Sequence, residues 1–151
     1  MPYIFDSRER KNDHIKAWFD KHNIEYTVRK LDVGDYMLEE RPKTIVDRKK
    51  NLGEVATNLL NRSDAARFWR EVRKAHEEGI LLVILVEHGG QIHHINDVVN
   101  WKSQYSPVTG RRLLDEMIRL ERAYGVRWSF CDKRSTARRI VEILNGSEEV
   151  L

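Results

Sequence analysis

The sequence feature that most constrains the fold is the run ILLVILVE at residues 80–87. It is apolar at every position before its final glutamate and follows directly on Gly79. A strand with one wet face alternates apolar and polar residues, whereas a strand covered by helices on both faces reads as a continuous apolar run. Residues 80–87 therefore predict a central strand in a sheet that has helices packed on both sides.

Hydrophobic periodicity and turn residues place the other elements around this strand. Strands are expected at 3–5, 24–31, 36–40, 44–49 and 126–130, and helices at 9–22, 52–59, 64–78, 95–102, 109–124 and 133–145. The first strands would meet as a meander, and the later ones would join through helical crossovers. We therefore expect one α/β domain over residues 1–146, with a mixed central β-sheet flanked by helices on both faces, and a frayed tail at 147–151.

The composition limits the class of protein. No apolar run approaches the roughly 20 residues of a membrane span, and no signal peptide is recognised ahead of Tyr3. We therefore expect an intracellular protein without a membrane partner, in the cytoplasm or at the nucleoid, or in the host cytoplasm if viral. Cys131 is the only cysteine, which favours a reducing compartment and a buried, inert thiol. The net charge of +3 permits a polyanionic partner without arguing for one.

Two acidic residues converge in the expected hairpin at 36–49. Asp35 opens its first strand and Asp47 closes its second, so antiparallel pairing sets their carboxylates side by side. Lys49 is two residues beyond Asp47 and projects from the same face. Two carboxylates suit a hard divalent cation, and the lysine could orient or deprotonate a water or pair with a phosphate. The simpler interpretation is a common Gly-Asp turn followed by the solvated end of a strand.

The motifs FDSRE (5–9), GDY (34–36) and VDRK (46–49) resemble the signature of XPF/Hef-type nuclease domains. This family is restriction-endonuclease-like in fold and belongs to the PD-(D/E)XK superfamily. The resemblance extends through NLLNRSDAARFWREVRKA (58–75), LVILVE (82–87) and FCDKRSTARRIVEIL (130–144). It implies metal-dependent cleavage of branched or flapped DNA near single-strand junctions, and dimerisation through this domain.

The resemblance also implies a set of site residues. The catalytic residues would be Asp35, Asp47, Lys49, Arg48, Asp6, Glu9 and Glu54, with Asp35 and Asp47 as ligands of Mg²⁺, for which Mn²⁺ could substitute. Asp47 stands where the family has glutamate. The last acid of the family pattern would fall on Gly53, so Glu54 is the candidate to replace it. No tandem helix-hairpin-helix domain follows in this sequence.

Basic and aromatic residues outside the motifs are candidates for binding DNA. Arg62, Arg67 and Arg70 follow the motif on helices, and Arg111 and Arg112 open a later helix that Thr109 can cap. A solvated surface is the alternative for both groups. Trp101 and Tyr105 could stack on unpaired bases, although packing is the commoner role of large aromatic residues. The histidines of HGGQIHH (88–94) lack a fourth zinc ligand and favour a plain loop.

The leading hypothesis is a Mg²⁺-dependent DNA endonuclease that acts in DNA repair, recombination or phage DNA processing. The alternative is a catalytically inactive DNA-binding or dimer-partner module of the same fold, and retention of Asp35, Asp47 and Lys49 argues against it. A third possibility is a small α/β regulatory domain with coincidental acids, which would bind neither metal nor DNA. A homodimer is also expected, with apolar faces of the helices at 109–124 and 133–145 as its interface.

Overall fold

The computed structural model describes residues 2–61, 63, 65–104 and 106–146, so the tail expected at 147–151 lies outside the described part. The described strands form a six-stranded sheet with the order β2–β1–β3–β4–β5–β6. Strand β3 is antiparallel to both of its neighbours, and the pairs β1–β2, β4–β5 and β5–β6 are parallel. The strands are β1 (Tyr3–Asp6), β2 (Tyr26–Arg29), β3 (Tyr36–Leu38), β4 (Thr44–Lys49), β5 (Leu81–Glu87) and β6 (Arg127–Cys131).

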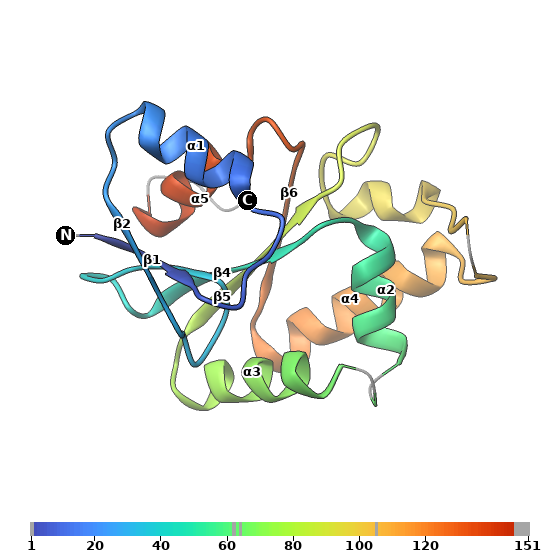
Figure 1. Ribbon diagram of the computed structural model, residues 1–151. Coiled ribbons are helices and arrows are strands. Elements are labelled where there is room, and N and C mark those ends of the chain that lie inside the picture. Colours follow the sequence, from blue (N-terminus) through green and yellow to red (C-terminus); the bar gives the residue numbers. More distant parts are fainter. Residues whose placement is uncertain (1, 62, 64, 105, 147–151) are drawn as a thin grey trace.

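Helices cover both faces of the sheet, as Figure 1 shows: α1 and α5 lie on one face, and α2, α3 and α4 on the other. A 3-10 helix, η1, packs against α4. This arrangement confirms the expected α/β fold with a mixed sheet. The helices are α1 (Asp13–Lys21), α2 (Leu52–Leu60), α3 (Ala66–Glu77), η1 (Ile95–Asn100), α4 (Gly110–Tyr124) and α5 (Thr136–Leu144).

Alternate residues of β5 enter two separate hydrophobic cores. Leu82, Ile84 and Val86 pack among α2, α3 and α4, whereas Val83 and Leu85 pack with α1 and α5. None of these five side chains is more than 2% exposed. The continuous apolar run at 80–87 is thus explained, because β5 is buried on both faces between β4 and β6.

The order of the first strands differs from the expected meander. Strand β1 lies between β2 and β3, so β2 and β3 are not neighbours. Instead, β2 is a parallel edge strand that the chain reaches from β1 through α1. Thr27, Val28 and Arg29 are exposed along β2, as suits an edge, whereas Phe5 of β1 is fully buried. The buried strand takes the interior place, and the exposed strand takes the edge.

The apolar faces of α4 and α5 pack inside the chain. Leu113, Met117 and Leu120 belong to the core under α2, α3 and α4, and Ile140 and Leu144 belong to the opposite core. The expectation that these faces form a dimer interface therefore does not hold, because the chain's own sheet already covers them. Among the helices of the described residues, none combines the length and the hydrophobicity that a membrane span requires.

Candidate active site

A glycine turn sets the position of Asp35. Gly34 has a φ of +69°, and a Cβ on it would lie 2.5 Å from Cγ2 of Ile45, so no larger residue fits here. The amide of Asp35 donates to the carbonyl of Val46 at 2.8 Å, and Tyr36 pairs directly with Val46. The hairpin register therefore sets Asp35 opposite Asp47, as the sequence predicted.

The two carboxylates form a coupled pair with one lysine beside it. Burial and the hydrogen-bonded carboxylate of Asp47 raise the pKa of Asp35 well above its usual range. Oδ2 of Asp35 accepts the backbone amide of Arg48 at 2.8 Å, which fixes its orientation. Nζ of Lys49 lies 3.4 Å from Oδ2 of Asp47 and 4.3 Å from the ring centroid of Phe68. The predicted shared face of Asp47 and Lys49 is confirmed.

The charge state of Lys49 follows from its surroundings. Burial alone would lower the pKa of Lys49, but the carboxylates of Asp47, Glu54 and Asp35 outweigh it and the pKa is raised. Lys49 is therefore a cation at neutral pH. This favours a role as a positive charge that pairs with a phosphate, and it opposes a role as the base that deprotonates water.

The donor set fits a divalent cation that keeps part of its hydration shell. The buried carboxyl of Asp35 and the partly exposed carboxylate of Asp47 face one another, and their repulsion helps to hold the pKa of Asp35 high; a cation between them would neutralise both ionised groups. Within the described residues, no group of three or more His, Cys, Asp or Glu side chains could hold a metal. A cation at Asp35 and Asp47 would therefore need water and substrate phosphate as further ligands, the mode in which Mg²⁺ is usually bound.

Glu54 lies beside this pair but is engaged at the start of α2. Its Oε1 accepts the amide of Lys50 at 2.8 Å, and its own amide donates to Oδ1 of Asn51 at 2.9 Å. The bond to Asn51 caps α2, and the Glu54 carboxylate holds the residue just before the cap. Glu54 is near enough to raise the pKa of Lys49, yet the geometry gives its carboxylate a contact with the backbone that leads into the helix. Its proposed replacement of the last family acid stays a prediction.

Glu71 of α3 is a carboxylate at the site that the sequence analysis did not single out. Its Oε1 accepts the amide of Gly34 at 2.7 Å, and its Oε2 lies 3.2 Å from Nε of Arg67. Burial raises its pKa, and the nearby charge of Asp47 acts in the same direction. Glu71 ties the glycine turn to α3. The available signal was its place on the apolar stripe of α3, between Phe68 and Val72.

Arg48 points to the opposite face of the sheet from Asp47 and Lys49, because side chains alternate along β4. Its Nε lies 2.7 Å from Oε2 of Glu9, and its Nη1 lies 3.3 Å from Oε1 of Glu87. Nε2 of His14 lies 2.8 Å from the other oxygen of Glu87. The residues that the resemblance groups together are thus divided: Glu9 and Arg48 form a buried ion cluster under α1 and α5. Their part in catalysis stays a prediction.

Asp6 is engaged in holding the chain between β2 and β3. Its Oδ1 accepts the amide of Leu31 at 2.8 Å, and its Oδ2 accepts Nε of Arg8 at 3.1 Å. The backbone amide of Asp6 donates to the carbonyl of Asp35 at 2.8 Å. Asp6 therefore supports the segment that leads into the glycine turn, and its catalytic role stays a prediction.

The basic residues predicted to bind DNA lie at the surface. Arg67 and Arg70 are exposed on α3, and Arg62 and the aromatic candidate Tyr105 lie outside the described residues. Arg111 and Arg112 are exposed at the start of α4. Oγ1 of Thr109 accepts the amide of Arg112 at 3.1 Å, which confirms the predicted cap. Among the described residues, histidines 88, 93 and 94 belong to no group of three or more side chains that could hold a metal.

Comparisons with known proteins give a family and a fold. The ERCC4 domain matches residues 5–143. Two solved structures, of XPF from Aeropyrum pernix and of the same protein in complex with DNA, are each 20% identical to the chain with a TM-score of 0.68. Each match covers 97% of this chain but only 65% and 64% of those chains, so this chain spans less than two thirds of their length. No curated protein sequence matches significantly.

Proposed function

The chain belongs to the ERCC4 domain family, and from this premise we propose that it is a DNA endonuclease that depends on a divalent metal ion. Membership confirms the resemblance to XPF/Hef-type nucleases that the motifs suggested. The observation that carries the proposal is the pairing of the buried Asp35 with the partly exposed Asp47, with the cation of Lys49 at 3.4 Å from Asp47. Holding two carboxylates next to one another costs free energy, and binding of a metal ion between them would offset this cost.

Asp35 and Asp47 would hold Mg²⁺, or Mn²⁺ in its place. The bound ion would lower the pKa of a coordinated water and offset negative charge on the phosphate. Lys49, held as a cation, would pair with the scissile phosphate and stabilise charge that grows on its oxygens. The amide of Arg48 keeps the Asp35 carboxylate turned toward Asp47, so that both are in place before substrate binds.

DNA is the proposed substrate, in branched, flapped or forked form with a single-strand junction. The structure of XPF from Aeropyrum pernix in complex with DNA supports DNA as the partner, and so do the exposed arginines of α3 and α4. Repair, recombination and phage DNA processing are the settings in which such cleavage is needed. The protein would act inside the cell, where DNA is found.

We also propose a homodimer, which the family resemblance supports. The interface must use surfaces other than the apolar faces of α4 and α5, because these are buried in the chain itself. Light scattering at micromolar concentration should give about twice the chain mass of 17.9 kDa. A monomer under these conditions would contradict the dimer and leave the cleavage chemistry untouched.

Cleavage of defined DNA tests the proposal. Labelled flap, fork and linear duplex DNA would be incubated with the protein in Mg²⁺, in Mn²⁺ and in EDTA. We expect cuts near the junction of the flap and the fork with either metal, little cutting of the duplex, and none in EDTA. DNA binding without cutting under every metal condition would instead favour the inactive binding module.

A further inference from the structure

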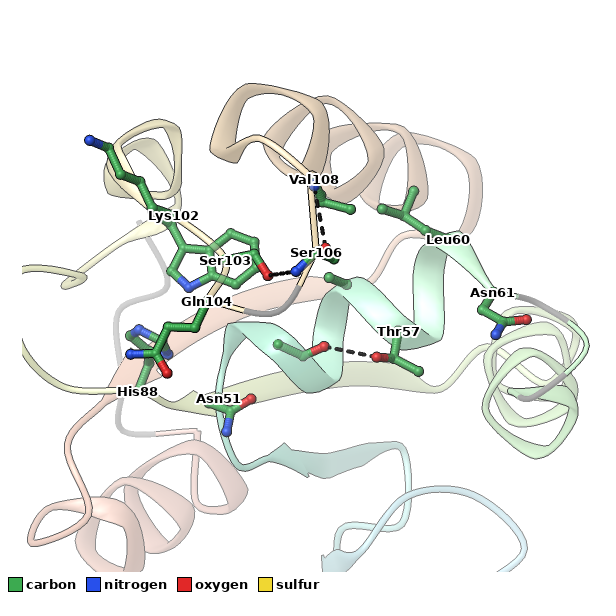
Figure 2. Close-up of a pocket in the computed structure, with 13 residues that line it drawn as sticks. Asn51, Thr57, Leu60, Asn61, His88, Lys102, Ser103, Gln104, Ser106 and Val108 are labelled. Atoms are coloured by element: carbon green, nitrogen blue, oxygen red, sulfur yellow. Dashed lines mark hydrogen bonds between the residues drawn. The ribbon is translucent and has the colours of Figure 1, made fainter.

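A pocket of about 730 Å³ opens between α2 and the segment 101–108. Figure 2 shows Asn51 and Thr57 of the α2 side facing Ser103, Gln104 and Ser106 of the segment across it. Its size is that of a typical small-molecule site and exceeds what a water cluster needs. The sequence offered Trp101 as a candidate for stacking on unpaired bases but did not predict a pocket beside it.

The pocket lies at the same end of the sheet as the carboxylate pair. Asn51, which caps α2, is two residues beyond Lys49, and His88 is the first residue after β5. The amide of Leu52 donates to Nδ1 of His88 at 3.0 Å and so ties the two strand ends together. In register, Lys49 of β4 pairs with Val86 of β5. The pocket therefore lies beyond the carboxyl ends of these parallel strands, at the same end of the sheet as the candidate active site, although Asp35, Asp47 and Lys49 are not among its described lining residues.

The described residues of this wall, 101–104 and 106–108, are held by contacts with one another and with the start of α4. Lys102 and Thr109 form a backbone bridge across its base. Oγ of Ser103 accepts the amide of Ser106 at 3.1 Å. A Cβ at Gly110 would collide with the carbonyls of Val98 and Trp101, so α4 starts in close contact with η1. Trp101 is half-buried and packs against the core, which fixes the position of its ring.

The lining has the chemistry of a nucleotide site. It combines one large aromatic ring, Trp101, with the cation of Lys102 and with side-chain amides and hydroxyls such as Gln104 and Thr57. None of the described lining residues is acidic, so the pocket does not repel phosphate and is unsuited to a cation. Burial lowers the pKa of His88, and its Nδ1 accepts a hydrogen bond, so the neutral ring has its proton on Nε2 and is a donor.

We infer that this pocket takes one unpaired nucleotide of the DNA substrate, with its base against Trp101 and its phosphate at Lys102. A base within a duplex is stacked and paired and cannot enter, so the pocket selects a single-stranded residue beside the bond to be cut. The inference rests on the proposed nuclease function and deepens it: the junction is recognised through one unpaired base held at the end of β4 and β5. A free nucleotide would meet the same groups, but the place of the pocket at the end of β4, the strand that carries Lys49, favours a residue of the cleaved strand.

Binding of a forked DNA with single abasic sites tests the inference. The probe is a duplex with a thymidine arm, measured by fluorescence anisotropy in EDTA so that no cutting occurs. Each arm residue near the junction is replaced in turn by an abasic residue. We expect one position at which loss of the base weakens binding to the wild type by about tenfold, the effect of one base–aromatic stack.

Two variants address the pocket from different sides. Trp101→Ala removes the ring, and Thr57→Phe, on the exposed side of α2, fills the space while Trp101 is kept. Both should bind the intact fork about tenfold more weakly. Replacing the critical base by an abasic residue should then cause no further loss, because the variant has already removed the contact between that base and the pocket. Trp101→Phe should retain most of the affinity. Thr27→Phe, the same change at an exposed position of the edge strand β2, should bind like the wild type.

The possible results distinguish a failure of the pocket proposal from a failure of the proposed nuclease function. If a protein that cleaves forks shows no abasic position whose effect disappears in Thr57→Phe, the pocket does not hold a base and the nuclease assignment stands. The pocket is likewise excluded as a base site if the loss of affinity caused by each variant and the loss caused by each abasic residue are additive at every position. If the wild type neither binds nor cuts forked DNA, both proposals fail. Unfolding curves of the variants ensure that the comparison is made between folded proteins.

Discussion

The two faces of β4 differ in what their charged side chains contact. On the face covered by α2, α3 and α4, Asp47 meets Asp35 and Lys49, and like charges lie together with incomplete compensation. On the face covered by α1 and α5, Arg48 is paired with both Glu9 and Glu87. Its Nη2 also donates to the carbonyl of Arg10 at 2.7 Å. Negative charge on the first face is therefore not fully balanced, whereas the cation of the second face is paired with two carboxylates.

This difference indicates two functions for consecutive residues of one motif. A site that must bind a cation and a phosphate keeps charge available, whereas a cluster that holds elements together uses its charge internally. Arg48 joins β4 to the segment before α1 and to the end of β5. We therefore interpret Asp35, Asp47 and Lys49 as the chemical side of β4, and Arg48 with Glu9 as the side that holds the strand in place.

The largest expected effect is on the chemical side. Asp35→Ala and Asp47→Ala should each abolish detectable cleavage of flap DNA, because each removes a metal ligand and the charge balance of the site. Both variants should remain folded, since removing one of two facing carboxylates relieves repulsion, but Asp35→Ala should lose some unfolding free energy because the amide of Arg48 loses its acceptor. Cleavage assays and urea unfolding measure the two quantities. Asp115→Ala, which removes an exposed carboxylate on α4, is the matched control and should cut like the wild type.

The next effect concerns the opposite face. Arg48→Met should lower the unfolding free energy by about 3–5 kcal/mol, because it removes the guanidinium that pairs with the carboxylates of both Glu9 and Glu87. Arg122→Met, at an exposed position of α4, should change it little. Cleavage per folded molecule at low temperature should fall far less than in Asp47→Ala. A variant as stable as the wild type but inactive would place Arg48 in the chemistry and remove the distinction between the two faces.

The smallest effect is expected away from both faces of β4, at the start of α4. Arg111→Ala/Arg112→Ala should weaken DNA binding and reduce the slope of its salt dependence by about one for each lost phosphate contact. The rate of cleavage at saturating enzyme should change little. Arg119→Ala/Arg122→Ala removes the same charge further along the same helix and is the control. Equal slopes for the two double variants would show that Arg111 and Arg112 are ordinary surface residues.

Local patterns were sufficient for much of this fold. The apolar run at 80–87 correctly predicted a strand buried on both faces, and Thr109 correctly predicted a helix cap. The convergence of Asp35 and Asp47 followed from the antiparallel pairing of two strands that are close in sequence. These features depend on residues close in sequence, where periodicity and turn chemistry decide the outcome.

What the sequence could not supply depends on distant contacts. The insertion of β1 between β2 and β3 follows from which strand is more deeply buried, a property of the whole sheet. The partners of Arg48 lie 39 residues away in both directions, and only the assembled sheet brings them together. The separation of Arg48 from Asp47 was available from strand alternation, but the family motif treats the two residues as one unit.

The central claim is that Asp35 and Asp47 hold a divalent cation, and Mn²⁺ uptake tests it most directly. Free Mn²⁺ would be titrated with protein bound to an uncleavable flap DNA and followed by electron paramagnetic resonance. We predict that the wild type and Asp115→Ala remove Mn²⁺ from solution and release it on addition of Mg²⁺, and that Asp47→Ala removes far less. Equal uptake by the wild type and Asp47→Ala, or no uptake above that of the DNA alone, would contradict the account.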